Sequence, residues 1–128
     1  MEKKMNDKGF SLVELIIVIA IMAVLIGLLA PMYLKYVNNS KVSTDVTNAQ
    51  SIATAFNVAM ADGQITASTY TTIPTGVNMS AWPLPKHTAG ETWEVTVTTN
   101  GVSQITLGGL EIYPNPETSG HYYQVRHQ

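Results

Sequence analysis

The sequence predicts an α+β protein in which a long N-terminal α-helix packs on a small antiparallel β-sheet head. Two observations support this fold class. An apolar run near the N-terminus passes into a segment whose apolar residues recur at helical spacing. The second half instead alternates apolar and polar residues around glycine-containing turns. The expected parts are a leader at 1–9, an apolar helical segment at 10–30, an amphipathic helical segment at 31–61 and a sheet head at 62–128.

Composition limits the function classes. The chain has 128 residues, of which 12% are charged, and its formal net charge is -2. This balance does not support nucleic-acid binding, which requires a basic face, and no direct nucleic-acid site is evident. The sequence has no cysteine, which excludes a disulfide, a thiolate metal site and a cysteine nucleophile.

The first helical segment follows a short polar leader that contains lysines. No polar side chain occurs from Leu15 to Ala30, and Phe10 to Ala30 as a helix covers about 30 Å, the thickness of a bilayer core. The run is longer than the apolar centre of a secretory signal peptide, and Leu28 stands where cleavage requires a small residue. The simplest interpretation is one membrane span with a cytoplasmic N-terminus, which the leader lysines favour weakly.

Glu14 is the exception in this apolar run. A charged side chain at the centre of a bilayer costs about 2.5–3.5 kcal/mol, so such residues usually have a partner and a function. The alternative is a carboxylate near the membrane edge that extends to water.

The stretch GFSLVE, from Gly9 to Glu14, and the apolar run that continues to Pro31 resemble the type IV pilin family. The resemblance covers roughly the N-terminal half of the chain. It implies that a prepilin peptidase cleaves after Gly9 on the cytoplasmic side of the membrane and that Phe10 is then N-methylated. It also implies that Glu14 pairs with the N-terminal amine of a neighbouring subunit during assembly.

Electrostatics is consistent with this implied pairing. Cleavage creates a positive amine on Phe10 in the same apolar surroundings as Glu14, and an unpaired buried charge is costly. The pair would therefore specify axial register more than it adds stability. Phe10 and Glu14 are also four residues apart on one helix face, so a lone subunit can pair them internally. Gly27 and Pro31 mark a weak helical segment, which we expect to kink or unwind in a filament and to stay helical in an isolated subunit.

The partners that the resemblance implies are other pilin subunits, minor pilins included, a prepilin peptidase, an inner-membrane assembly platform and an assembly ATPase. The precursor would be a single-pass membrane protein and the product an extracellular pilus used for adhesion, motility or DNA uptake. One alternative is a pseudopilin of a type II-like secretion or competence system. A second is a membrane-anchored extracellular binding module. No feature supports an enzyme or a cofactor.

The segment after Pro31 has an apolar stripe at spacings of three and four residues. The stripe comprises Val42, Val46, Ala49, Ile52, Ala53, Phe56, Ala59 and Met60. Asp45 is assigned to the opposite, polar side with Lys41 and Thr44, among others. Asp62 and Gly63 are expected to end the helix, with Gly63 in a left-handed conformation.

The head is expected to contain three or four strands. Asn100 and Gly101 indicate a hairpin, and a three-residue loop with Gly101 at a left-handed bulge pairs Val95 with Ile105 and Trp93 with Leu107. A further strand is expected at Leu110–Tyr113.

Three other expectations concern the loops and the C-terminal end. A short strand is possible at Tyr70–Ile73, and the proline-rich loop is expected to place Trp82 and Leu84 against the sheet. An edge strand at Tyr122, Tyr123 and Val125 would hold the C-terminal end by sheet pairing, because no cysteine is available. No metal is expected, since the histidines lack zinc-motif spacing and are interpreted as surface residues; they are His87, His121 and His127.

Overall fold

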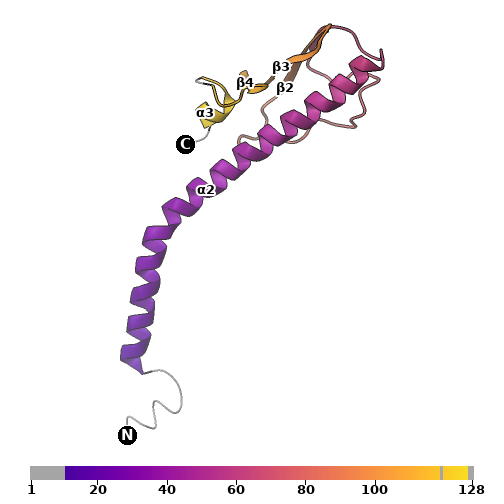
Figure 1. Ribbon diagram of the computed structural model, residues 1–128. Coiled ribbons are helices and arrows are strands. Elements are labelled where there is room, and N and C mark those ends of the chain that lie inside the picture. Colours follow the sequence, from indigo (N-terminus) through magenta and orange to yellow (C-terminus); the bar gives the residue numbers. More distant parts are fainter. Residues whose placement is uncertain (1–10, 119, 127–128) are drawn as a thin grey trace. The chain divides into compact units, whose positions relative to one another are not determined.

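The computed structural model describes residues 11–118 and 120–126, and the chain divides into two compact units, Met1–Tyr36 and Val37–Gln128. The expected cleavage and methylation positions, Gly9 and Phe10, lie outside the described residues. Helix α2 (Leu12–Ala61) contributes to both units, and each unit is described separately below (Figure 1).

The sheet of the second unit confirms the predicted fold class. Its strands are β1 (Ser68–Tyr70), β2 (Trp93–Thr98), β3 (Gly101–Leu107) and β4 (Leu110–Tyr113), followed by the short helix α3 (Tyr122–Arg126). The four strands follow the order β1-β2-β3-β4, and each pairs antiparallel with its neighbour. A single meander therefore lies along the second part of α2 (Figure 1).

The core of the second unit lies between α2 and the inner face of the sheet, and it contains the predicted apolar stripe. Its buried side chains include, from α2, Val42, Ala49, Ile52, Ala53, Phe56 and Ala59, and, from the sheet, Trp93, Val95, Val97, Ile105, Leu107 and Ile112. Val46 and Met60 pack against this core while partly exposed. Alternate residues of β2 are buried, as a strand with one covered face requires.

Helix α2 ends as predicted. Gly63 has a φ of 73°, its N–H donates to the Met60 carbonyl at 3.1 Å, and the Gln64 N–H donates to the Ala59 carbonyl at 2.9 Å. These two bonds form a Schellman motif, which satisfies carbonyls at the end of the helix.

The register of the β2–β3 hairpin is confirmed, but its loop differs from the prediction. Trp93 pairs with Leu107 and Val95 with Ile105, as expected from the buried face. Thr98 pairs with Gly101, however, so only residues 99 and 100 form the turn, and the extra residue of the bulge is Ser103.

The side chain of Asn57 on α2 explains this difference. Its Oδ1 accepts the N–H of Val102 at 2.8 Å. A Cβ on Gly101 would lie 2.6 Å from the same Oδ1, and Gly101 has a φ of 118°. A glycine is therefore required here by both the backbone conformation and the close approach of Asn57.

Two loop expectations were wrong in detail. The first strand ends at Tyr70 and does not extend to Ile73. In the proline-rich loop, Trp82 stacks on Phe56 of α2, with ring centroids 6.0 Å apart and planes 6° apart. Leu84 was expected to pack against the sheet, but it is 76% exposed. The indole N–H of Trp93 donates to the Pro83 carbonyl at 2.8 Å and also holds this loop, so Leu84 is not needed to anchor it.

Candidate assembly surface and buried polar cluster

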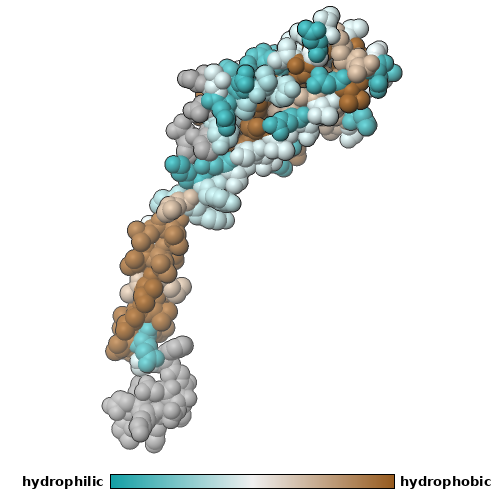
Figure 2. All heavy atoms as spheres, viewed as in Figure 1, coloured by the Kyte–Doolittle hydropathy of each residue, from teal (hydrophilic) through white to brown (hydrophobic). Residues whose placement is uncertain are grey.

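The first unit presents an apolar helix surface that no other described residue covers. Every residue from Leu12 to Tyr36 is exposed, and this part of α2 is long and apolar enough to cross a membrane. Figure 2 shows this surface as an almost continuous hydrophobic cylinder. A helix that is apolar on all sides belongs in a membrane or in the interior of a helical assembly. We call the surface of Leu12–Tyr36 the assembly surface.

Glu14 lies in the first turn of α2, beside the residue that caps it. The Glu14 N–H donates to Ser11 Oγ at 3.2 Å, and the Leu15 N–H donates to the Ser11 carbonyl at 3.0 Å. Ser11 is thus the N-cap, and Glu14 occupies the third helical position, where the helix dipole favours a carboxylate. The Ser-x-x-Glu spacing is the sequence signal of a capping box, and the sequence analysis missed it.

The other expected residues of this segment are placed only in part. Pro31 lies inside α2, which continues through it. Proline has no N–H, so the Gly27 carbonyl lacks its usual helical donor. A kink at Gly27 and Pro31 and the pairing of Glu14 with Phe10 stay predictions.

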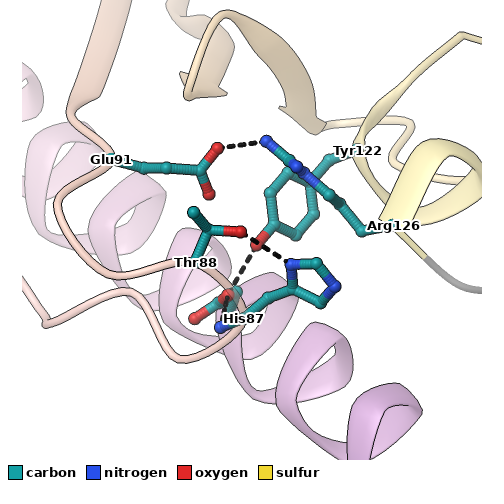
Figure 3. Close-up of polar contacts among 6 residues, drawn as sticks. His87, Thr88, Glu91, Tyr122 and Arg126 are labelled. Carbon is teal, nitrogen blue, oxygen red and sulfur yellow. Dashed lines mark hydrogen bonds and ion pairs between the residues drawn. The ribbon is translucent and has the colours of Figure 1, made fainter. Parts of the chain in front are cut away.

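Asp45 corrects the assignment of polar residues on α2. It was placed on the exposed side, but it is 0% exposed. Its Oδ1 accepts the N–H of Lys86 at 2.7 Å. Its Oδ2 accepts the N–H of His87 at 3.1 Å and the hydroxyl of Tyr122 at 2.6 Å (Figure 3). Three donors compensate the buried carboxylate, as a charge removed from water requires.

The environment of Tyr122 keeps its hydroxyl protonated. Burial raises the pKa of Tyr122 well above its ordinary value, and the hydrogen bond to Asp45 and the negative charge of that carboxylate raise it further. The hydroxyl therefore remains a donor to Asp45 at neutral pH.

An ion pair secures the end of α3. The guanidinium of Arg126 pairs with Glu91 and lies 5.8 Å from the centre of the Tyr122 ring (Figure 3). The Arg126 carbonyl accepts the side-chain N–H of Asn38 at 3.0 Å. A Cβ at Gly108 would lie 2.0 Å from Glu91 Oε2, so the β3–β4 turn needs glycine to admit this carboxylate.

These contacts correct the expected edge strand at the C-terminal end. Residues 122–126 form α3, with the Val125 N–H donating to the His121 carbonyl at 2.9 Å. Tyr122 and Arg126 are four residues apart on this helix, so one face presents both side chains to the cluster. The polar cluster, defined here as Asp45, Glu91, Tyr122 and Arg126, fastens the C-terminal segment without sheet pairing.

The histidines take part in local contacts. His87 is half-buried, with its Nδ1 2.9 Å from Thr88 Oγ1. His121 is half-buried, with its Nδ1 3.3 Å from Glu111 Oε2, so neither is the plain surface residue expected. His127 lies outside the described residues. Among the residues that are described, no three His, Cys, Asp or Glu side chains are grouped to hold a metal.

Comparison with known proteins concerns mainly the N-terminal half. A family model described as the prokaryotic N-terminal methylation motif matches residues 4–30. A type IV major fimbrial protein FimA of Dichelobacter nodosus is 36% identical over 61 residues, which cover 48% of this chain and 39% of that protein. A fimbrial protein of Moraxella nonliquefaciens is 35% identical over 73 residues, covering 57% and 47%. The chain thus spans less than half the length of these curated relatives. No solved structure matches.

Proposed function

We infer that this protein is a structural subunit of a type IV pilus-like surface filament, because its N-terminal segment matches the prokaryotic N-terminal methylation motif and is similar to that of type IV fimbrial proteins. The observation that carries this proposal is the assembly surface. It exposes every residue from Leu15 to Leu34 without a charged side chain among them, and it has no partner within the described chain. Lipid covers such a surface before assembly, and helices of neighbouring subunits cover it in a filament.

Maturation of the subunit follows from the same segment. We propose that a prepilin peptidase cleaves after Gly9 and that Phe10 is N-methylated. The new amine then pairs with Glu14 of a neighbouring subunit and fixes the axial register. The capped first turn supports this role, since it holds the Glu14 backbone in a defined helical position next to the new terminus.

The proposed life cycle has two locations. The precursor is a single-pass membrane protein with its N-terminus in the cytoplasm, and the mature subunit is part of an extracellular filament. Its partners are other pilin subunits, the peptidase, an inner-membrane platform and an assembly ATPase. The head contributes a small antiparallel sheet whose polar outer strand residues, such as Glu94 and Thr98, are exposed.

Substitution of Glu14 by glutamine tests the pairing. Glutamine has nearly the same size and keeps a polar side chain at this helical position, but it removes the charge. We expect the Glu14→Gln precursor to be cleaved after Gly9 and to assemble into far fewer filaments than the wild type. Sheared surface filaments are quantified, and mass spectrometry identifies the N-terminus of the membrane-bound protein.

The matched control is Ser11→Ala, which removes the cap and keeps the charge. It is expected to cost about 1 kcal/mol of helix stability and to leave most assembly intact. Wild-type filament yield from Glu14→Gln would instead show that assembly does not need the charge of Glu14. An intact leader on the wild-type protein would support the membrane-anchored module, and a processed subunit absent from surface filaments would support the pseudopilin alternative.

A further inference from the structure

The exposed apolar surface of α2 continues to Tyr36, beyond the end of the apolar run at Ala30. Beyond Ala30, Tyr33 is 66% exposed and Tyr36 is 70% exposed, and the next large apolar side chain of α2 with comparable exposure is Val58. From Val37 onward the helix side chains begin to be covered by the head. Tyr36 is therefore the last large apolar side chain of the assembly surface, and Tyr33 and Leu34 precede it by less than one helical turn.

The position of these tyrosines along the helix matches the thickness of a membrane. The helical rise places Tyr33 about 32 Å and Tyr36 about 36 Å from Leu12. The hydrocarbon core of a bilayer is about 30 Å thick. No charged residue occurs between Glu14 and Lys35. If Glu14 lies at one edge of the core, both tyrosines lie at the other edge.

The chemistry of this segment suits the headgroup layer. Tyr33 and Tyr36 are three residues apart and share one helix face. Within the described residues, neither hydroxyl has a hydrogen-bond partner, so both remain available to lipid phosphate or water. Tyrosine is enriched at membrane interfaces because its ring is apolar and its hydroxyl polar. The ammonium of Lys35, between them in the chain, complements the phosphate charge.

We propose that Tyr33 and Tyr36 bind the outer headgroup layer of the membrane and set the depth of the precursor before assembly. The embedded stretch then extends past Ala30 and includes Pro31. This inference depends on the proposed storage of the precursor in a membrane. It adds a specific pair of anchors at the outer surface of that membrane.

Cysteine accessibility of the full-length precursor tests the proposal, because the chain has no cysteine of its own. Single cysteines replace Ile21, Met32 or Ser40 in precursor reconstituted into phosphatidylethanolamine–phosphatidylglycerol vesicles, and a membrane-impermeant maleimide measures the labelling rate. We expect Met32→Cys to react slowly and Ser40→Cys to react fast. Combining Met32→Cys with Tyr33→Ala and Tyr36→Ala should raise its rate several-fold, because the apolar stretch shortens.

Two control backgrounds accompany this measurement. Tyr33→Trp with Tyr36→Trp retains interfacial aromatic side chains and should keep Met32→Cys protected. Val58→Ala removes an exposed apolar side chain from the part of α2 beyond the assembly surface and should leave the labelling rate unchanged.

The possible contrary results are distinguishable. If Met32→Cys reacts as fast as Ser40→Cys in the otherwise unchanged chain, the tyrosines do not lie at the interface and the inference is overturned. Met32→Cys could also stay slow to react in the double alanine variant and become fast only when the protein is diluted in lipid. That result would show that a second copy of the chain covers this position, and it would overturn the inference as well. Rapid labelling of Ile21→Cys would instead contradict membrane storage, and with it that part of the proposed function.

Discussion

Asp45 illustrates what a single residue contributes to this head. It lies three residues after Val42 and four before Ala49, so helical spacing puts its carboxylate within the apolar stripe. The signal was therefore present in the sequence as a charge on the buried face. The donors could not be predicted, because Lys86, His87 and Tyr122 reach Asp45 only through the fold.

Replacement of Asp45 by asparagine should destabilise the head. The amide NH₂ would face one or more of the donors now satisfied by the carboxylate, and a buried polar group left unpaired costs about 1–3 kcal/mol. For a domain of this size, each kcal/mol lowers the thermal midpoint by about 4–8 °C. Near-UV circular dichroism of the detergent-solubilised chain measures this midpoint. Asp62→Asn, at an exposed position in the turn that follows α2, is the control and should unfold like the wild type.

Tyr122 makes the free energy of unfolding of the head depend on pH in the alkaline range. Its pKa is raised in the folded state, so at high pH the unfolded state releases the phenolic proton more readily. The stabilisation is complete below the ordinary tyrosine pKa of about 10 and is lost as the pH rises above that value. Urea unfolding at increasing pH should therefore show a steeper loss for the wild type than for Tyr122→Phe.

The comparison of the wild type with Tyr122→Phe at neutral pH provides a control for this prediction. There, Tyr122→Phe should be less stable by about 1 kcal/mol, because the buried Asp45 carboxylate loses one donor. The difference between the two proteins should shrink as the solution becomes alkaline. A constant difference across this range would show that Tyr122 is not the titrating group.

At the scale of elements, local patterns predicted the structure where one periodicity dominates. The stripe of α2 and the pairing of Val95 with Ile105 follow from periods of 3.6 and 2. The predicted strand at the C-terminal end was wrong because the aromatic residues Tyr122 and Tyr123 favour strands, whereas contacts with Asp45 and Glu91 select a helix. Tertiary contacts decide such a short segment.

The β2–β3 hairpin depends on Gly101 and its neighbour Asn57. Gly101→Ala should destabilise the head by about 1–3 kcal/mol, because alanine is strained at this φ and its Cβ meets Asn57 Oδ1. Asn57→Ala removes that obstruction, so the Gly101 change should cost less in the double variant. Urea unfolding of the four proteins of this cycle measures the coupling. Strictly additive costs would mean that the close approach of Asn57 does not constrain Gly101.

The whole molecule joins two segments whose sequences are informative to different degrees. A helix that is apolar on all sides satisfies its own backbone, so the first unit can be recognised without any tertiary information. The head is closed by the polar cluster, whose members come from three separate places in the chain: α2, the loop before β2, and α3. Such a cluster leaves little periodic signal, which explains why the fold class was predicted and the fastening of the C-terminal end was not.

The head should fold without the assembly surface. Its buried apolar core begins at Val42, and no residue from Leu12 to Tyr36 is buried. A chain of residues 37–128 is therefore expected to be a soluble monomer by size-exclusion chromatography, with a thermal midpoint close to that of the full chain in detergent. Asp45→Asn should shift both midpoints equally, since the polar cluster lies entirely within this part. If the shortened chain unfolds without a cooperative transition, the N-terminal part of α2 must support the head, and the division into two units would be wrong.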